Sequence, residues 1–349
     1  MKKSVLALCL TTTAAIIMFS SFSLFGGKKK KNAENDVRKN SVVVYAYDSF
    51  AGEWGPGPEL VAMFKKNTGL DLTLVDCGDA GQAASRAILE KGRVQADVLL
   101  GGDNNLITKL READILKAYK PKGAANIKEG LSETLGGDWI LTPFDYSHFA
   151  IIFDTESGLE EPKSLEDLTK DIYEKKLILM DPRTSTPGLG FVTWTAAIFG
   201  DKVVDYWSNL KKSILTMSPG WTAGYGLFTS GEAPLVISYT TSPAYHYEEN
   251  KSTRFKSLVF EQGHPQQVEG VGLLKGAVNE EGGKKFIDFL ISEEAQAVLP
   301  LTQWMYPANK NVKVPESYNV AAPIPSKTVS AKPADIQKTL DSVIAVLSN

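Results

Sequence analysis

The stretch Asp181-Pro-Arg-Thr-Ser-Thr-Pro-Gly-Leu-Gly190 decides how the chain folds, because it joins a short apolar run to an apolar segment of helical length. The run before it, Leu177–Met180, has the length and composition of a buried strand. Residues Thr184 to Thr186 can cap a helix, and Pro187 suits the first helical turn. Unpaired N–H groups at such a helix start favour a phosphate or a carboxylate. The turn therefore predicts an anion site or an ordinary helix cap.

A second turn of the same kind lies further along the chain. Leu235–Ser238 is typical of a strand, and Tyr239-Thr-Thr-Ser-Pro-Ala-Tyr-His246 follows it directly. Ser242 is the expected N-cap of the next helix, with Pro243 at its first position. In an open α/β sheet such turns lie at the carboxyl ends of strands, where ligands usually bind.

Strand and helix patterns alternate through the first part of the chain, as in a doubly wound α/β lobe. The expected elements in order are strand Val42–Tyr47, helix Pro58–Asn67, strand Leu70–Val75, helix Gly81–Glu90, strand Asp97–Leu100 and helix Asn104–Ala113. A second set begins with strand Phe149–Phe153 and includes both turns described above, and the chain ends in an expected helix, Asp335–Leu347.

Charge and length restrict the function classes. The 349 residues are enough for two lobes and a targeting segment. The first 40 residues contain eight Lys/Arg and two Asp/Glu, which leaves 30 basic and 39 acidic residues in the remainder. Because that remainder is acidic, nucleic acid is not an expected partner.

The N-terminal segment predicts export. Val5–Phe25 is an uncharged, largely apolar run after two lysines, as in a signal peptide, yet it is also long enough to span a bilayer. We therefore expect residues 1–27 to be a signal peptide or an N-terminal membrane anchor, followed by a polar linker over residues 28–40. Cys77 is the single cysteine after this segment, so no internal disulfide is expected there.

Besides the two turns, residues 42 to 310 contain a series of further motifs: Tyr47-Asp-Ser-Phe50, Trp54-Gly-Pro-Gly-Pro58, Gly102-Asp-Asn-Asn105, Pro143-Phe-Asp-Tyr146, Gly220-Trp221, Tyr225-Gly-Leu-Phe228 and Trp304-Met-Tyr-Pro307. In this order, the motifs resemble those of the periplasmic thiamine-binding proteins of bacterial ABC thiamine transporters.

The resemblance implies an α/β, two-lobed type II periplasmic-binding-protein fold with a ligand cleft between the lobes. Lobe 1 would comprise residues 41–145 and 263–312, and lobe 2 residues 146–262, with chain crossings near Asp145 and Gln262 forming the hinge. Residues 313–349 would form a linker and a C-terminal helix packing on lobe 2.

The resemblance also implies a function. The chain would be a monomeric solute-binding protein of the periplasm or another extracytoplasmic space, free or tethered to the inner membrane by an uncleaved N-terminal segment. It would capture thiamine, and its mono- and diphosphate, and deliver them to an ABC permease with its ATPase. No catalysis, no metal and no resident cofactor are implied.

Family-like ligand contacts fall on two groups of residues. The first group is Asp79, Ala80, Ser185, Thr186, Trp221, Tyr239, Thr240, Thr241 and Ser242, and the expected ring-packing residues are Tyr47, Trp54, Tyr245 and Trp304. Aromatic faces suit the thiazolium cation, and the hydroxyl-rich helix starts suit a phosphate. Ala80 departs from the glycine expected beside Asp79, and Asp79 either contacts the ligand or caps the helix Gly81–Glu90.

Other functions remain open at this stage. A ferric-ion or polyamine binder would share the fold, but His148, His246 and His264 show no tight metal-ligand spacing. Thiamine-cleaving enzymes with a cysteine nucleophile have a similar fold, and Cys77 lies near the inferred site. Asp76 and Asp79 would raise the pKa of that thiol, which disfavours a nucleophile.

Overall fold

The computed structural model describes residues 38–348, and the chain from Lys39 onward forms one compact unit. The predicted export segment, residues 1–27, and most of the predicted linker lie outside the described residues. Among the described residues, no helix is both long and apolar enough to cross a membrane.

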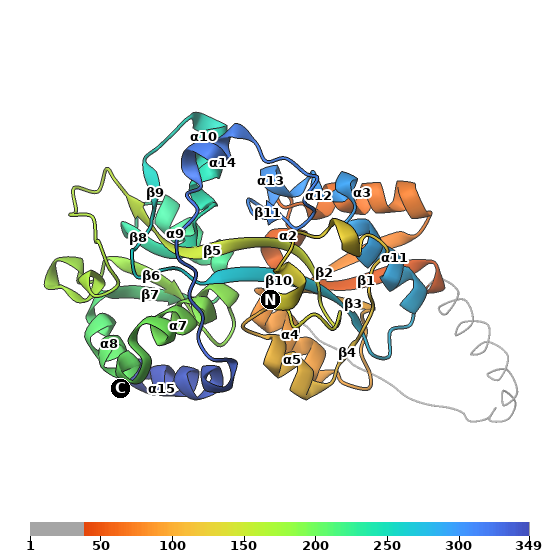
Figure 1. Cartoon of the computed structure of the whole chain (residues 1–349), viewed down its shortest axis with the longest axis horizontal. Helices are drawn as coiled ribbons and strands as arrows, with labels where there is room; N and C mark the ends of the chain where they lie inside the picture. The colour runs from red at the N-terminus through yellow and green to blue at the C-terminus, as the bar shows by residue number, and fades with distance from the viewer. Residues whose placement is uncertain (1–37, 349) are drawn as a thin grey trace, which may run out of the picture. The chain divides into compact units, whose positions relative to one another are not determined.

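The elements alternate between strands and helices along most of the described chain (Figure 1). The strands are β1 (Ser41–Ala46), β2 (Asp71–Asp76), β3 (Val98–Asp103), β4 (Leu116–Lys117), β5 (Thr142–Asp154), β6 (Leu177–Met180), β7 (Ile214–Ser218), β8 (Leu235–Tyr239), β9 (Phe255–Leu258), β10 (Gln266–Leu274) and β11 (Tyr306–Pro307). The helices are α2 (Asp48–Ala51), α3 (Gly57–Thr68), α4 (Ala80–Leu89), α5 (Ile107–Ala113), α6 (Leu131–Thr134), α7 (Thr186–Phe199), α8 (Val203–Leu210), α9 (Trp221–Thr229), α10 (Ser242–Asn250), α11 (Glu280–Leu290), α12 (Glu293–Gln296), α13 (Leu299–Thr302), α14 (Glu316–Ala321) and α15 (Ile336–Ser348).

The predicted elements are all present, with two corrections at helix starts. Helix α5 begins at Ile107 rather than at Asn104, because the Asp103 carboxylate accepts from the backbone N–H groups of Asn105 and Leu106 and holds them in a turn. Ser242 is not the N-cap of α10, because Thr241 holds that position and Ser242 is the first helical residue.

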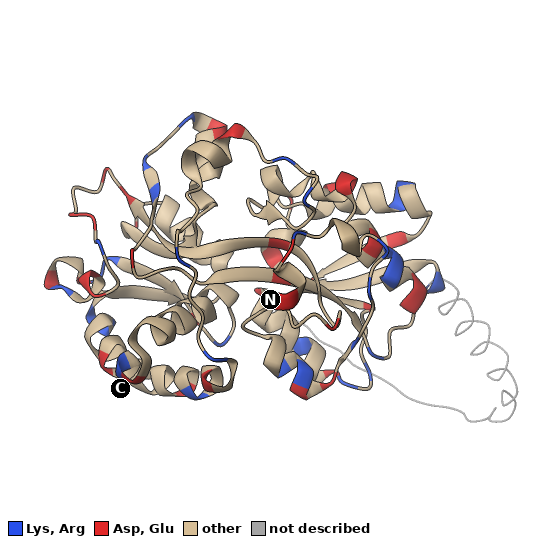
Figure 2. Ribbon diagram, in the orientation of Figure 1, with Lys and Arg blue, Asp and Glu red and all other residues tan. Residues whose placement is uncertain are grey.

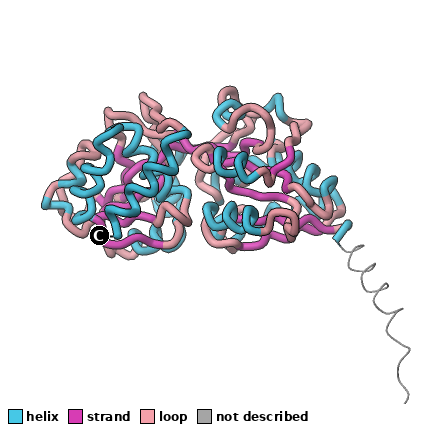
Figure 3. Tube along the Cα trace, turned by 90° about the horizontal axis from the view of Figure 1, so that it is seen from below, coloured by secondary structure: helices cyan, strands magenta, loops and turns pink. Residues whose placement is uncertain are grey.

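Strands β5 and β10 join the two halves of the sheet, whose order is β2-β1-β3-β10-β5-β8-β6-β7. Strand β5 is buried along all 13 residues. Its first part pairs with β10, and the part from Phe149 to Phe153 pairs with β8. The same two strands therefore belong to the core of one half and lead into the other (Figures 1 and 3).

Helices cover both faces of the first half. Strand β1 alternates, so that Val42 and Val44 pack with Phe64 of α3, whereas Tyr45 packs with Ala83 of α4 on the opposite face. This alternation positions α4, whose first turn forms part of the site described below.

Two glycines of the deciding stretch let α7 lie close to the second half of the sheet. A Cβ on Gly188 would lie 2.4 Å from the carbonyl oxygen of Met180, and one on Gly190 would lie 2.3 Å from the ring of Phe149. Larger residues would push α7 away from β5 and β6 and would displace the start of α7 at Thr186.

The C-terminal helix α15 packs on α7 and α8. Its side chain Val343 is fully buried in the core of the second half. The lobe boundaries near Asp145, Gln262 and residue 312 stay predictions, because residues from Lys39 onward form a single compact unit.

Candidate ligand site

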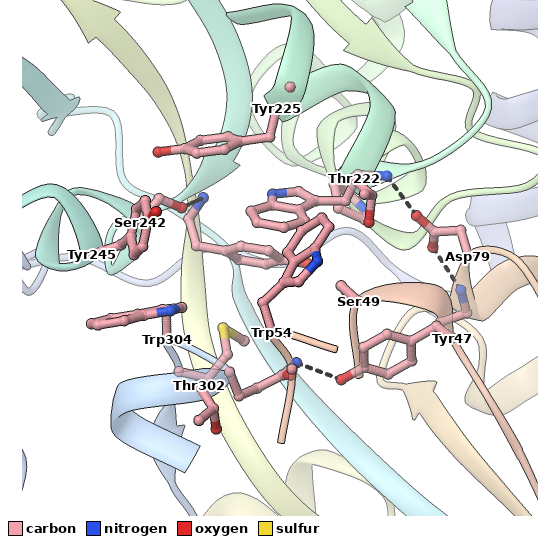
Figure 4. A pocket seen from close by; sticks show the side chains of 18 of the residues that line it. Tyr47, Ser49, Trp54, Asp79, Thr222, Tyr225, Ser242, Tyr245, Thr302 and Trp304 are labelled. Carbon is pink, nitrogen blue, oxygen red and sulfur yellow. Dashed lines mark hydrogen bonds between the residues drawn. The ribbon is translucent and has the colours of Figure 1, made fainter. Parts of the chain in front are cut away.

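A cavity of about 540 Å³ lies between the two halves of the sheet. Residues of α2, β10 and the start of α4 line it from the first half, and residues of α7, β8, α9 and α10 line it from the second. In Figure 4, Tyr245 and Trp304 lie on one side of this cavity, and Tyr47 and Asp79 lie on the other.

Ten of the thirteen predicted contact residues line this cavity. They are Tyr47, Trp54, Asp79, Ala80, Thr186, Trp221, Tyr239, Ser242, Tyr245 and Trp304. The predicted positions span more than 250 residues of sequence, and the fold brings these ten to one place. Their contact with a ligand stays a prediction.

Ser185, Thr240 and Thr241 do not line the cavity. Ser185 is the buried N-cap of α7, and its carbonyl accepts from Leu189. The hydroxyl of Thr241 lies 3.0 Å from that of Ser147 on β5, and both threonines are fully buried. The hydroxyls of Thr240 and Thr241 therefore contact Ser147 and hold the turn between β8 and α10 against β5, instead of facing the cavity.

Asp79 connects the two halves of the site. Its Oδ1 accepts from the N–H of Thr186 at 3.1 Å, its Oδ2 accepts from the N–H of Trp221 at 2.9 Å, and it forms a capping box with Gln82 at the start of α4. Burial raises the pKa of Asp79, and the N–H donors of Trp221 and Thr186 oppose that rise. One of the two helix starts predicted to receive an anion, that of α7, thus receives a carboxylate of the protein, and so does the start of α9.

Ala80, which replaces the expected glycine, fits because the neighbouring strand has no side chain there. A Cβ on Gly101 of β3 would lie 3.1 Å from the Cβ of Ala80 and 2.6 Å from the ring of Tyr47. The Ala80 methyl therefore packs over bare backbone and forms part of the cavity wall.

One aromatic wall of the cavity is a stacked pair at the start of α9. The rings of Trp221 and Tyr225 lie 4.9 Å apart at 15°, and the indole N–H donates to the Ser238 hydroxyl at 2.7 Å. That hydroxyl lies 2.7 Å from the hydroxyl of Ser242. The polar contacts fix the orientation of the indole face, and a fixed indole face suits a cationic ring.

A second aromatic wall comprises Tyr245 and Trp304, whose rings meet edge to face at 5.3 Å. Trp304 has a φ of +58°, a left-handed conformation that costs a non-glycine residue roughly 1–2 kcal/mol. The cost is consistent with a backbone held to aim this indole at the cavity. Trp54, at the rim, is 71% exposed and leaves a large apolar surface free for a ligand.

Glu269 of β10 is a cavity residue that the sequence analysis missed. Its Oε2 accepts from the Tyr47 hydroxyl at 2.6 Å, and that hydroxyl accepts from Gln303 Nε2 at 2.6 Å. Burial raises the pKa of Glu269 to about 8. A charged residue inside the apolar run Val268-Glu-Gly-Val271 was the available signal.

The cavity wall is acidic. It contains Asp79, Glu249 and Glu269, and none of the described residues that line it is Lys, Arg or His. Arg183, which might have reached an anion, instead forms an ion pair with Asp181 in its own turn. The basic residues lie mainly on the outer helices and loops (Figure 2). Within residues 38–348, no group of His, Cys, Asp or Glu has an arrangement that could hold a metal ion.

Comparison with known proteins identifies the family of this chain. Residues 95–328 match the model of a family described as bacterial extracellular solute-binding protein. The chain belongs to this family. A thiamine-binding periplasmic protein of Brucella melitensis is 37% identical over 93% of this chain and 94% of its own length. Its counterpart in Escherichia coli is 36% identical over 85% of this chain and 89% of its own length.

Solved structures agree with this placement. A periplasmic thiamin binding protein superposes with a TM-score of 0.83 at 34% identity, covering 88% of this chain and 96% of its own. A ferric binding protein from Campylobacter jejuni superposes with a TM-score of 0.71 at 15% identity, which shows a shared fold alone. The predicted fold class, a type II periplasmic-binding-protein fold, is thereby confirmed for this solute-binding protein.

Proposed function

We propose that this solute-binding protein captures thiamine in the cavity described above and delivers it to the permease of an ABC transporter. The observation that carries the proposal is an acidic cavity with two aromatic walls and no basic residue in its described lining. Thiamine is a permanent cation made of two flat rings, so it suits both the charge and the walls. The names of the relatives at 36–37% identity support the same ligand.

Calorimetric titration of the purified chain with thiamine tests this function. We expect saturable binding of one thiamine per chain, with intact vitamin recovered by mass analysis. Putrescine and ferric citrate serve as the competing ligands. A chain that binds either of them and not thiamine contradicts the proposal.

We further propose that this receptor has no catalytic activity, is a monomer and is located in the periplasm. Its N-terminal segment is either removed or tethers the protein to the inner membrane. Its relatives are binding proteins, and Cys77 does not line the cavity. Burial raises the pKa of the Cys77 thiol, and the nearby Arg86 guanidinium opposes that rise. A thiol with a raised pKa is a poor nucleophile at neutral pH.

We extend the proposal to the mono- and diphosphate of thiamine. The N–H groups of Thr186 and Trp221 lie at helix starts and bind a carboxylate already, so they are suited to an anion. A ligand phosphate at this position has to displace or approach the charge of Asp79. The phosphate esters and Asp79 therefore compete for the same donors.

Replacing Asp79 by asparagine is expected to raise the affinity for thiamine monophosphate relative to thiamine about tenfold. The change removes a negative charge next to the phosphate position, and a difference of about 1.4 kcal/mol corresponds to a factor of ten. Titration with both ligands measures the ratio. Asp76→Asn, which removes an exposed carboxylate three residues earlier, is the control and should leave the ratio unchanged. Equal changes for both ligands in Asp79→Asn would contradict the competition.

A further inference from the structure

Three carboxyl groups lie in a row across three neighbouring strands, next to the cavity. Glu269 of β10 is the direct cross-strand partner of Asp103 on β3 and of Asp145 on β5. Asp103 and Asp145 are fully buried, and Glu269 is 4% exposed. Direct cross-strand partners project from the same face of a sheet, so the three groups are neighbours. Burying this row costs a large amount of free energy if all three carboxyl groups are charged.

The first member of the row is stabilised as a carboxylate. Asp103 accepts from Gln267 Nε2 at 2.9 Å and from the backbone N–H groups of Asn105 and Leu106. Burial still raises the pKa of Asp103 to about 6, so the group is ionised at neutral pH. Its negative charge then acts on Glu269.

The other two members lack comparable compensation. Among residues 38–348, neither oxygen of Asp145 has a hydrogen-bond partner of good geometry. Burial, together with the charge of Glu269, raises the pKa of Asp145 well above its usual range. Glu269 accepts from the Tyr47 hydroxyl, and its contact with Asp145 raises the pKa of Asp145 and opposes the rise in the pKa of Glu269. The empty cavity therefore favours a pair, Asp145 and Glu269, that retains a proton.

The other titratable groups that act on Glu269 do not supply a positive charge. They are Asp103 on β3, Asp145 on β5, Asp79 at the start of α4, Tyr47 before α2 and Tyr239 at the end of β8. Burial raises the pKa of both tyrosines well above the usual value, so each remains a neutral phenol. The described residues of β5 and β10 include no Lys or Arg. None of the groups named here is cationic, and Glu269 lines the cavity.

We propose that Glu269 is the residue that selects a positively charged ligand, and that the ligand's cation replaces the proton held by the Asp145–Glu269 pair. This inference rests on the proposed function. On binding, the O–H bond of the protonated carboxyl breaks, the electron pair stays on the carboxylate oxygen and the proton passes to the buffer. One positive charge enters and one leaves, so the exchange leaves the charge of the site unchanged.

The exchange makes binding dependent on pH. Burial raises the pKa of Glu269 to about 8, so below about pH 8 the Asp145–Glu269 pair holds its proton in the ligand-free protein, and thiamine has to displace it. The affinity should therefore rise with pH, by up to tenfold for each pH unit between 6 and 8. Above about pH 8 the dependence should level off.

Titration of the full chain with thiamine in two buffers of different ionisation enthalpy counts the released protons. We expect close to one proton per bound thiamine at pH 7 for the wild type, and close to none for Glu269→Gln. Glu53→Gln removes an exposed carboxylate outside the cavity lining and is the matched control, with a wild-type proton count. The uncharged analogue thiochrome, binding to the wild type, should release no proton.

The outcomes separate this inference from the proposed function. A wild type that binds thiamine without releasing a proton, or a Glu269→Gln variant that releases as many, overturns the role of Glu269 and leaves the function intact. A wild type that does not bind thiamine overturns both. Thermal unfolding at pH 9 shows whether Glu269→Gln is folded, and we expect its midpoint at or above that of the wild type because a buried charge has been removed.

Discussion

Replacing Trp221 by alanine is expected to weaken thiamine binding about 100-fold. The indole forms one wall of the cavity and is held by its stack on Tyr225 and its hydrogen bond to Ser238. A desolvated cation–π contact contributes about 2 kcal/mol, and lost ring burial adds a similar amount. Allowing for partial collapse of the wall, a loss of about 3 kcal/mol corresponds to 100-fold in Kd. Calorimetric titration measures it.

A second substitution at the same position distinguishes the contribution of the aromatic ring to binding from an effect on the fold. Trp221→Phe retains an aromatic face and loses the N–H donor to Ser238, so we expect a loss of about tenfold or less. The backbone N–H that binds Asp79 is present in both variants, which preserves the start of α9. Binding of thiamine by Trp221→Ala within threefold of wild type would show that this indole is not a ligand wall.

The order of elements was predictable from the sequence because it depends on local patterns. The runs Val42–Tyr47 and Leu177–Met180 are apolar and of strand length, and the structure has β1 and β6 there. The close approach of α7 to β5, where Gly190 lies against the ring of Phe149, was not predicted from the sequence. The motif resemblance then placed ten residues that line one cavity.

What the sequence could not show depends on pairings between distant residues. The Asp79 carboxylate reaches N–H groups 107 and 142 residues away, so no local pattern indicates that the anion position is already occupied. Thr240 and Thr241 were expected at the ligand because hydroxyls follow a strand end. In the structure, their side chains turn toward Ser147 on β5, a contact set by the register of β5 and β8.

Glu269 shows the same limit. A lone acid in a buried strand signals a function, but its partners come from the pairing of β10 with β3 and β5. Glu269 follows Asp145 by 124 residues and Asp103 by 166 residues in the sequence (269 − 145 and 269 − 103). Sequence reasoning therefore placed the aromatic residues, Asp79 and some of the hydroxyl residues at the cavity and left out Glu269.

Replacing Trp194 by alanine is expected to lower the free energy of unfolding by about 4 kcal/mol. This side chain of α7 is fully buried, its ring contacts those of Phe260 and His264, and its indole N–H donates to the Gly263 carbonyl at 2.8 Å. The substitution leaves a large cavity and an unpaired carbonyl, and both effects destabilise. Urea unfolding followed by circular dichroism measures the loss. A domain of ordinary stability, about 5–15 kcal/mol, remains folded at low temperature.

Thiamine distinguishes this structural role of Trp194 from a role in binding. Trp194 does not line the cavity, so the folded Trp194→Ala chain should bind thiamine nearly as tightly as the wild type. Thiamine at 100 times its Kd should then stabilise both chains equally, by about 2.7 kcal/mol. Trp194→Phe, which keeps a ring and leaves the Gly263 carbonyl unpaired, should lose only about 1–2 kcal/mol. If thiamine stabilises the wild type and not Trp194→Ala, then α7 transmits the packing at Gly263 to its first residue, Thr186, and the indole belongs to the binding machinery.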